Sequence, residues 1–486
     1  MGAIDPHALT RDDSWAGLRA VVAGFGVSGF AAADNLLFLG ADVTALDERS
    51  TDERAEQARL LESLGAKVRL GPGSTATLPE DVDLLVTSPG WKPDAPLLAQ
   101  ARERGVPVWG EVELAWRLRA TSDAPPWIGV TGTNGKTTTV QMVHAIMTAA
   151  GLRSALVGNV GRPVVEAVMD PEPYDVLVVE LSSFQLHWTE TVACESAAVL
   201  NLAEDHLDWY PGADGMAAYA ADKGRIYTGV ERVCVYNSAD PATRRLVEEA
   251  DVVEGARAVG FTLAMPGVGE MGVVEDILVD RAFIPERHSS AAELCTLEDL
   301  PSPAPHVVAN ALAAAALSLA HGVPHVAVRD GLRSFRPDGH RIELVAETDD
   351  VRWVDDSKAT NPHAAQSSLL AYGQVVWIAG GLAKGAHFDD LVAAAADRLR
   401  AVVLMGRDRH VIAEALSRHA PQVPVVEIAD REDEPMERAV AAAAGFAQPG
   451  DTVLLAPGCA SMDMFTDYAA RGDAFAAAVR RGPARS

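Results

Sequence analysis

The chain has 486 residues, which is too long for a single hydrophobic core and suggests about three domains. Its composition, 48% hydrophobic and 22% charged, is that of an ordinary globular protein. The formal net charge of −27 argues against nucleic-acid binding, which normally needs a basic surface. Anionic ligands would therefore depend on local Lys, Arg and backbone N–H groups.

The cysteines and the N-terminus exclude further classes of protein. Four cysteines are far apart and form no C-x-x-C pair, so neither a zinc site nor a disulfide framework is expected. Residues 1–15 contain aspartates and no apolar run, which is unlike a signal peptide. No stretch of about 18 apolar residues is free of charge, so no membrane insertion is expected. These features predict a cytoplasmic protein.

The first segment, residues 1–122, opens with a βαβ unit. A strand at 19–23 leads into G-x-G-x-x-G at 24–29, then a helix that stops at Gly40 and a strand at 43–46 that ends at Asp47. Further strands are expected at 67–70 and 83–87. This alternation predicts an α/β segment with a Rossmann-like, doubly wound parallel sheet.

The glycine-rich turn of this unit suggests NAD binding, but the same turn can hold any diphosphate. Two details favour another ligand. Arg49 places a guanidinium beside Asp47, where it could stack on a base. Ser88-Pro89-Gly90 forms a second tight turn at the same sheet edge, for which a plain turn is the alternative interpretation. A linker is expected at 121–126.

The central segment, 127–336, carries the strongest motif. An apolar strand at 128–131 runs into Gly-Thr-Asn-Gly-Lys-Thr at 132–137 and then into a helix. Glycines let backbone N–H groups face a phosphate, and the helix N-terminus adds partial positive charge. Lys136 can reach the outer phosphates and Thr137 can coordinate Mg²⁺. Val130 stands where the general P-loop pattern has Gly, and an ordinary strand-to-helix turn is the alternative.

Polar residues follow later strands of this segment. A buried strand at 175–180 ends in Glu180, which in a P-loop fold would lie beside the phosphates and bind Mg²⁺. Another strand, expected at 198–202, is followed by His206, at the sheet edge where open α/β sheets bind ligands. Lys223 lies in an expected helix, where a lone lysine is normally solvated. The loop at 158–163 contains Asn159 and is otherwise an ordinary turn.

The pattern of the last segment, 337–486, predicts a second Rossmann-like domain with a doubly wound sheet. Apolar strands alternate with Ala- and Leu-rich helices, and the strands are expected at 352–354, 375–379, 401–405, 423–428 and 452–456. Several of them end in polar or glycine-rich turns, including Asp-Ser-Lys-Ala-Thr-Asn at 356–361 and the loop at 457–463. Such turns line one sheet edge and could form a site.

The ordered combination of these motifs resembles the Mur ligases of peptidoglycan synthesis. It consists of the motif at 132–137, Glu-Leu-Ser-Ser-Phe-Gln at 180–185, residues 201–206 and the two turns of the last segment. The resemblance implies a three-domain, ATP-dependent amide ligase that acts in the cytoplasm as a monomer. Its substrates would be ATP, UDP-N-acetylmuramoyl-L-alanine and D-glutamate, with two Mg²⁺ ions and without NAD, nucleic acid or membrane insertion.

The resemblance also implies roles for individual residues. The uridine-containing substrate would be bound by Ser28, Asp47, Arg49, Ser88, Gly90, Asn159, Ser182 and Gln185. ATP would contact Gly132, Thr133, Asn134, Gly135, Lys136, Thr137, Thr138, Asn310, Arg341 and Asp356. Metal ligands would be Thr137, Glu180, His206 and Lys223, the last as a carbamate, and Lys136, His206 and Lys223 would be catalytic. Glutamate would be held by Lys358, Thr360, Lys384, Ser461 and Met462.

One departure concerns the adenine side, where the family has His-Asn-x-x-Asn and this chain has Val307 in place of the first amide. Asn310 is retained. Rival interpretations are a sister ligase that adds L-alanine, diaminopimelate or a dipeptide, a folylpolyglutamate synthase, an NAD dehydrogenase and a non-enzymatic ATP switch. The sequence assigns no role to residues 260–305.

Overall fold

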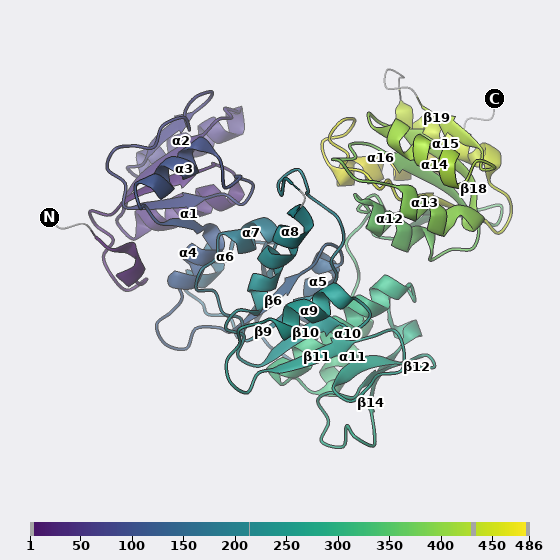
Figure 1. Cartoon of the computed structure of the whole chain (residues 1–486), viewed down its shortest axis with the longest axis horizontal. Helices are drawn as coiled ribbons and strands as arrows, with labels where there is room; N and C mark the ends of the chain where they lie inside the picture. The colour runs from purple at the N-terminus through teal and green to yellow at the C-terminus, as the bar shows by residue number, and fades with distance from the viewer. Residues whose placement is uncertain (1–3, 213, 429–433, 483–486) are drawn as a thin grey trace. The chain divides into compact units, whose positions relative to one another are not determined.

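The computed structural model describes residues 4–212, 214–428 and 434–482 (Figure 1). The chain forms two compact units. The first contains Met1–Leu202, Ala217–Leu300 and Ala309–Phe335, and the second contains Ala203–Met216, Pro301–Val308 and Arg336–Ser486. The N-terminal segment and most of the central segment thus belong to one unit, whereas the last segment forms most of the other, together with residues 203–216 and 301–308 of the central segment.

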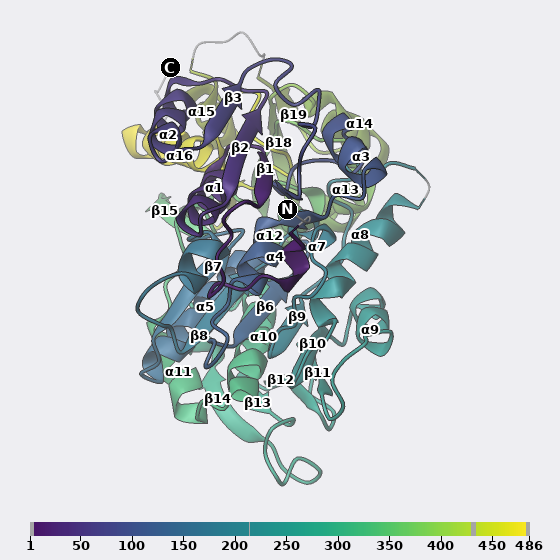
Figure 2. The same ribbon diagram turned by 90° about the vertical axis from the view of Figure 1, so that its left-hand side faces the viewer.

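The N-terminal sheet has five parallel strands in the order β3-β2-β1-β4-β5. Strands β3, β2 and β1 are labelled in Figure 2. This order places the topological switch between β1 and β4, where ligands bind in such sheets. The strands are β1 (Arg19–Ala23), β2 (Asp42–Asp47), β3 (Lys67–Leu70), β4 (Leu84–Thr87) and β5 (Val108–Gly110), and the helices are α1 (Val27–Phe38), α2 (Asp52–Ser63), α3 (Pro96–Glu103) and α4 (Glu111–Arg117).

The central sheet has nine strands in the order β14-β13-β12-β11-β10-β9-β6-β8-β7. They are β6 (Trp127–Thr131), β7 (Ser154–Gly158), β8 (Val176–Glu180), β9 (Ser196–Val199), β10 (Val233–Asn237), β11 (Arg257–Phe261), β12 (Glu270–Val274), β13 (Ile277–Asp280) and β14 (Ala292–Thr296). The last three strands pair antiparallel, so residues 260–305 extend an otherwise parallel sheet at its edge. The helices are α5 (Lys136–Ala149), α6 (Val164–Val168), α7 (Ser183–His187), α8 (Gly215–Gly224), α9 (Pro241–Glu248), α10 (Pro305–His321) and α11 (His325–Ser334).

The third sheet, in the second unit, has six strands in the order β15-β16-β20-β17-β18-β19. Only its edge pair, β15 and β16, is antiparallel among the described strands. The strands are β15 (Glu343–Thr348), β16 (Val351–Asp355), β17 (Val375–Gly380), β18 (Leu399–Met405), β19 (Val425–Glu427) and β20 (Thr452–Leu455), and the helices are α12 (Pro362–Leu369), α13 (Asp389–Ala395), α14 (Arg409–His419), α15 (Pro435–Phe446) and α16 (Tyr468–Arg481).

The first unit is held together by a core that crosses the boundary between its two segments. One cluster of buried side chains joins Trp109 and Val112 of the N-terminal segment to Val164 and Val165 of the central segment. Conversely, the central-segment residue Trp188 packs in the apolar cluster under the N-terminal sheet. Burial of such large side chains contributes about 1.5–3 kcal/mol each, which explains why the two segments form one unit.

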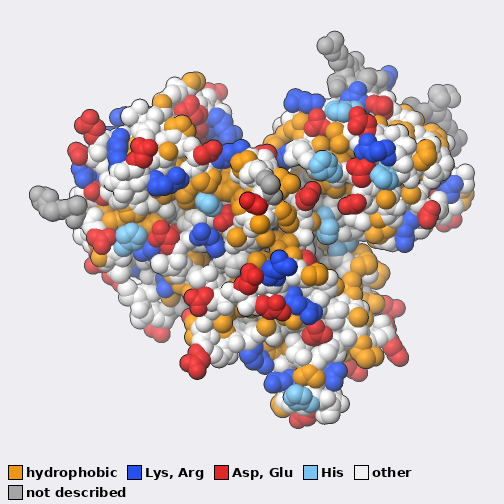
Figure 3. Space-filling model, in the orientation of Figure 1, with side chains coloured by type: hydrophobic (Ala, Val, Ile, Leu, Met, Phe, Trp, Pro, Cys, Tyr) orange, Lys and Arg blue, Asp and Glu red, His pale blue; other side chains and the backbone are white. Residues whose placement is uncertain are grey.

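The predicted strands are confirmed, with shifts at some ends. The strand expected at 198–202 is Ser196–Val199 instead, because residues 201 and 202 turn away to bond with neighbouring loops. There, Asn201 accepts the N–H of Thr133, and the N–H of Leu202 donates to Asp240. None of the described helices has the length and apolarity needed to cross a membrane. Acidic and basic side chains are intermixed on the face of the molecule that Figure 3 shows.

Candidate active site

The loop between β6 and α5 has the backbone of a phosphate cradle. Gly132 and Gly135 both have positive φ, at 149° and 83°, and Gly135 precedes the first residue of α5. A Cβ on Gly135 would lie 2.4 Å from the Asn310 Oδ1 atom, so a side chain there would displace Asn310 as well as strain a backbone with positive φ. The glycine-rich pattern is therefore required by geometry, and it places N–H groups at a helix N-terminus, where anions bind.

Side chains from other strands and helices fix this loop. The Asn201 side chain accepts the N–H of Asn134 at 2.9 Å and donates to its carbonyl at 3.1 Å. The Thr133 and Tyr219 hydroxyls lie 3.0 Å apart. Lys136 folds back over the loop and donates to the carbonyls of Gly132 and Thr133, both at 3.0 Å. A bound phosphate would offer this ammonium a stronger, charged acceptor.

Glu180 ends β8 directly beside the loop, because Val130 of β6 pairs with Glu180. Its side chain is 1% exposed, and its Oε1 atom accepts from Asn159 Nδ2 at 2.8 Å. The Oε2 atom is buried and has no hydrogen-bond partner among the described residues. A buried carboxylate oxygen without a partner is costly unless a cation binds it. This oxygen and the Thr137 hydroxyl provide the hard oxygen donors that Mg²⁺ prefers.

Lys223 lies at the end of α8 and is only 1% exposed. Its Nζ atom donates to the Gly132 carbonyl at 2.8 Å and lies 4.6 Å from the Tyr219 ring centroid. The structure therefore places Lys223 against the phosphate loop, not in solvent. The predicted helix ends at Gly224, and a 3₁₀ turn, η2 (Arg225–Tyr227), follows it.

Ser182 and Gln185, two predicted substrate residues, bond to each other. Ser182 is the N-cap of α7 and accepts the N–H of Gln185, while Gln185 Oε1 accepts the N–H of Ser182, which forms a capping box. Gln185 is 4% exposed. The side chains of Ser182 and Gln185 therefore stabilise the turn after β8. This turn directly follows Glu180, which bonds to Asn159.

The predicted uridine-binding residues surround the switch point of the N-terminal sheet. Asp47 accepts the N–H groups of Phe25 and Arg49 and pairs with Arg54 Nη1 at 2.6 Å. Arg49, whose guanidinium was expected beside Asp47, donates its backbone N–H to that carboxylate. Ser88 donates to the Gly24 carbonyl at 3.2 Å, so the turns after β1 and β4 contact each other. Ser28 is partly exposed, and Arg49 and Gly90 are exposed.

The second unit contains the loop that carries His206. His206 has a positive φ of 55°, and its N–H donates to the Asp205 carboxylate at 2.9 Å. Asn361 Nδ2 reaches the other oxygen of Asp205 at 3.4 Å. The loop is therefore anchored to the turn at 356–361, and the His206 side chain remains 36% exposed.

Asp356 is buried in the same unit. Burial raises the pKa of its carboxyl to about 6, opposed by a hydrogen bond from the Ser368 hydroxyl and by the charge of Arg341. Arg341 lies between His340 and Ile342, which both have positive φ. The structure thus brings the two ATP-contacting residues predicted in this segment, Arg341 and Asp356, close enough to interact.

The predicted glutamate residues lie on the loops after β16, β17 and β20. Lys358 Nζ is 4.0 Å from the centroid of the Tyr468 ring, and Thr360 follows in the same turn. Leu382 and Ala460 form an isolated bridge that joins the loop of Lys384 to the loop of Ser461 and Met462. Lys384 and Met462 are exposed, whereas Ser461 is buried.

Several supporting residues were not predicted from the sequence. The buried Arg471 donates to Ser357 Oγ, the Ser357 carbonyl and the Cys459 carbonyl, and burial lowers its pKa to about 10. Tyr219 and Tyr468 approach Lys223 and Lys358. Only a position on a helix facing a motif loop could have indicated them, and that depends on the three-dimensional packing.

Comparison with known proteins places this geometry in a family. Residues 18–110 match the Mur ligase MurD-like N-terminal domain, residues 130–318 the Mur ligase middle domain, and residues 340–459 the Mur ligase glutamate ligase domain. The chain belongs to the Mur ligase family. This agrees with the family resemblance noted in the sequence motifs.

Similar proteins include two named UDP-N-acetylmuramoylalanine--D-glutamate ligase. The one from Streptomyces avermitilis is 61% identical, covering 96% of this chain and 99% of that protein, and the one from Streptomyces coelicolor is 59% identical, covering 96% and 98%. The crystal structure of UDP-N-acetylmuramate-alanine ligase MurC from Thermotoga maritima matches with a TM-score of 0.56 at 19% identity, covering 96% of this chain and 99% of that one. This likeness shows the shared three-domain α/β fold.

Proposed function

We propose that this Mur ligase joins D-glutamate to UDP-N-acetylmuramoyl-L-alanine and converts ATP to ADP and phosphate. The geometry that supports the proposal best is the unpartnered, buried oxygen of Glu180 beside a phosphate-type loop.

The proposed reaction has two steps. A carboxylate oxygen of the alanyl group attacks the γ-phosphorus of ATP, the bond to the bridging oxygen breaks, and ADP leaves. The amine of D-glutamate then attacks the acyl carbon of the acyl phosphate, loses a proton, and phosphate leaves with the C–O bond electrons. Phosphorylation is needed because a bare carboxylate is a poor electrophile.

The residues of this chain have separate roles in that reaction. Lys136 would bind the γ-phosphate and offset its repulsion of the incoming carboxylate. Thr137, Glu180, His206 and Lys223 as a carbamate would hold two Mg²⁺ ions, which would supply charge neutralisation when bound. Asn310, Arg341 and Asp356 would contact ATP. The other assignments are as the family resemblance implies: Ser28, Asp47, Arg49, Ser88, Gly90, Asn159, Ser182 and Gln185 for the uridine substrate, and Lys358, Thr360, Lys384, Ser461 and Met462 for glutamate.

An amino-acid panel tests the proposal. Phosphate release is measured with ATP, Mg²⁺ and UDP-N-acetylmuramoyl-L-alanine while single amino acids, including both glutamate isomers, are added. We expect release that depends on D-glutamate. Release that depends on a different amino acid would move the assignment to a sister ligase. No release from folded, ATP-binding protein would contradict a ligase function.

A further inference from the structure

Helix α4 begins with two buried carboxylates, at the point where the N-terminal segment meets the central segment. Glu111 is 3% exposed and Glu113 is 0% exposed. Buried carboxylates are costly unless donors satisfy them, so their partners identify what they stabilise. For both residues, these partners include backbone groups of the central segment.

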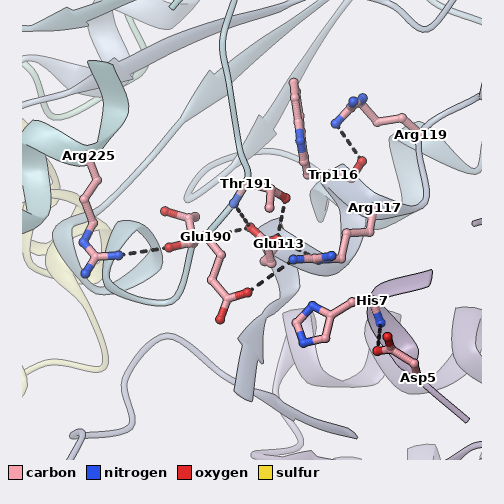
Figure 4. Close-up of polar contacts among 10 residues, drawn as sticks. Asp5, His7, Glu113, Trp116, Arg117, Arg119, Glu190, Thr191 and Arg225 are labelled. Carbon is pink, nitrogen blue, oxygen red and sulfur yellow. Dashed lines mark hydrogen bonds and ion pairs between the residues drawn. The ribbon is translucent and has the colours of Figure 1, made fainter. Parts of the chain in front are cut away.

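Glu113 binds the turn that follows α7. It accepts the N–H of Glu190 at 2.8 Å, the N–H of Thr191 at 3.0 Å and the Thr191 hydroxyl at 2.6 Å (Figure 4). Arg117, one turn further along α4, neutralises it with Nε at 2.7 Å. Arg225 donates to the Thr189 carbonyl at 3.0 Å, so the turn is fixed from two sides.

Glu111 binds a different part of the central segment. Its Oε1 atom accepts the N–H of Val165 at 2.7 Å, in the first turn of α6. Burial raises its pKa to about 7, opposed by hydrogen bonds from the backbone of Val164 and Val165. The loop immediately before α6 contains Asn159, which bonds to Glu180.

A close backbone contact joins the same two segments. The N–H of Gly110 donates to the Trp188 carbonyl at 3.1 Å, and a Cβ on Gly110 would lie 3.0 Å from the Trp188 Cβ. Residues 110–113 therefore bind both the turn after α7 and the start of α6. Asn159 lies just before one of these contacts, and Ser182 and Gln185 lie just before the other.

We propose that Glu113 and Glu111 are positioning residues for the uridine-containing substrate. They fix the loops at 158–163 and 181–191 relative to the N-terminal sheet, and so set the spacing between the two ends of one binding site. This rests on the proposed function, in which the N-terminal sheet holds the uridine diphosphate and these loops face the muramoyl-alanine end. A ligand bound at two places loses much of its affinity when their spacing is no longer fixed.

The test compares the affinity for the whole substrate with the affinity for UDP, which is one part of it. Affinities for UDP, for a non-hydrolysable ATP analogue and for UDP-N-acetylmuramoyl-L-alanine are measured by calorimetry for wild type and Glu113→Gln. Glu103→Gln, an exposed glutamate of α3, is the matched control. We expect the variant to bind the whole substrate at least tenfold more weakly, while UDP and ATP-analogue affinities stay within twofold. The KM for the whole substrate should rise similarly, and the KM for ATP should not.

Other results would overturn the proposal. Unchanged affinity for the whole substrate, or an equal loss for UDP alone, would show that Glu113 does not set the spacing. If Glu113→Gln does not fold, Glu111→Leu, which removes the acceptor of the Val165 N–H, and Thr191→Val, which removes one hydroxyl contact to Glu113, decide by the same comparison. The wild type separates this proposal from the proposed function. If wild type binds UDP as tightly as UDP-N-acetylmuramoyl-L-alanine, then the proposed function and the positioning role of Glu113 are both wrong.

Discussion

Lys136 is the side chain on which the proposed first step depends most. Its ammonium already lies over the phosphate loop, bonded to the carbonyls of Gly132 and Thr133. Lys136→Met keeps the apolar stem and removes the charge, so we expect turnover to fall on the order of 10²-fold or more. Phosphate release and thermal unfolding are measured together, with Lys67→Met as an exposed control. Near-normal turnover in the folded variant would contradict the assignment.

Glu180 makes a second residue-scale prediction, about metal ions. Glu180→Gln preserves size and the bond from Asn159 but removes the charge that would attract Mg²⁺. We expect the Mg²⁺ concentration for half-maximal rate to rise roughly tenfold or more, as for changes that weaken metal sites. Glu172→Gln, an exposed residue before β8, controls for loss of charge. An unchanged Mg²⁺ dependence would remove Glu180 from the metal site.

At the scale of elements, α4 predicts a dependence of stability on pH. Burial raises the pKa of Glu111 from 4.5 to about 7. The folded state therefore holds this proton more tightly than the unfolded state, and the stability gained below pH 4.5 is lost as pH rises through about 7. Ionisation of Glu111 lowers the free energy of unfolding by about 3 kcal/mol in total.

Comparison of wild type with Glu111→Gln isolates this effect. The variant cannot ionise at that position, so we expect its stability relative to wild type to increase between pH 4.5 and pH 7.5. Urea unfolding of both proteins at a series of pH values measures this difference. A constant difference over that range would show that Glu111 does not titrate as proposed.

Arg471 of helix α16 joins two loops of the second unit, so its removal should lower the stability of that unit. Arg471 donates to carbonyls of the loops at 355–359 and 457–461. Arg471→Met would leave buried carbonyls without partners, so we expect a loss of about 2–4 kcal/mol and a higher KM for D-glutamate. Arg480→Met, on the exposed face of the same helix, should change neither the stability nor the KM for D-glutamate. Denaturant unfolding and initial rates measure the two effects, and equal behaviour of both variants would contradict this role.

The elements show why sequence predicted some features well and others poorly. Glycine-rich turns and apolar strands carry local signals, so β1, β3 and the loop before α5 were predicted closely. The strand end expected at Leu202 was wrong, and β9 ends at Val199, because the Asn201 carbonyl accepts the N–H of Thr133 in the phosphate loop. Glu113 and Arg471 carry no local signal, since charged residues in helices are usually solvated, and only packing shows that they are buried.

For the whole molecule, the family, the three-domain fold and the ligase activity could be predicted because their motifs recur in a fixed order along the chain. The roles of individual residues could be predicted only as far as the resemblance reached. Val307 illustrates this limit, because it is buried in α10 where the family has an amide, and Asn310 of the same helix contacts the phosphate loop.

The residues proposed to act on ATP and the other substrates are divided between the two compact units, which leads to a prediction about the whole molecule. Lys136 and Glu180 belong to the first unit, whereas Arg341, Asp356 and Lys358 belong to the second. Since these residues would act on the same reactants, we expect the last domain to close on the ATP site. Small-angle scattering should show a smaller radius of gyration with an ATP analogue and both substrates than without ligands. No change in radius would count against closure.

Transfer of an isotope tests the central claim, that the substrate carboxylate is activated by ATP and then joined to D-glutamate. UDP-N-acetylmuramoyl-L-alanine labelled with ¹⁸O in its carboxylate is incubated with ATP, Mg²⁺ and D-glutamate, and phosphate and amide product are analysed by mass spectrometry. The mechanism predicts one ¹⁸O atom in each released phosphate and one molecule of amide product per ADP. Unlabelled phosphate, or phosphate without amide product, would contradict it.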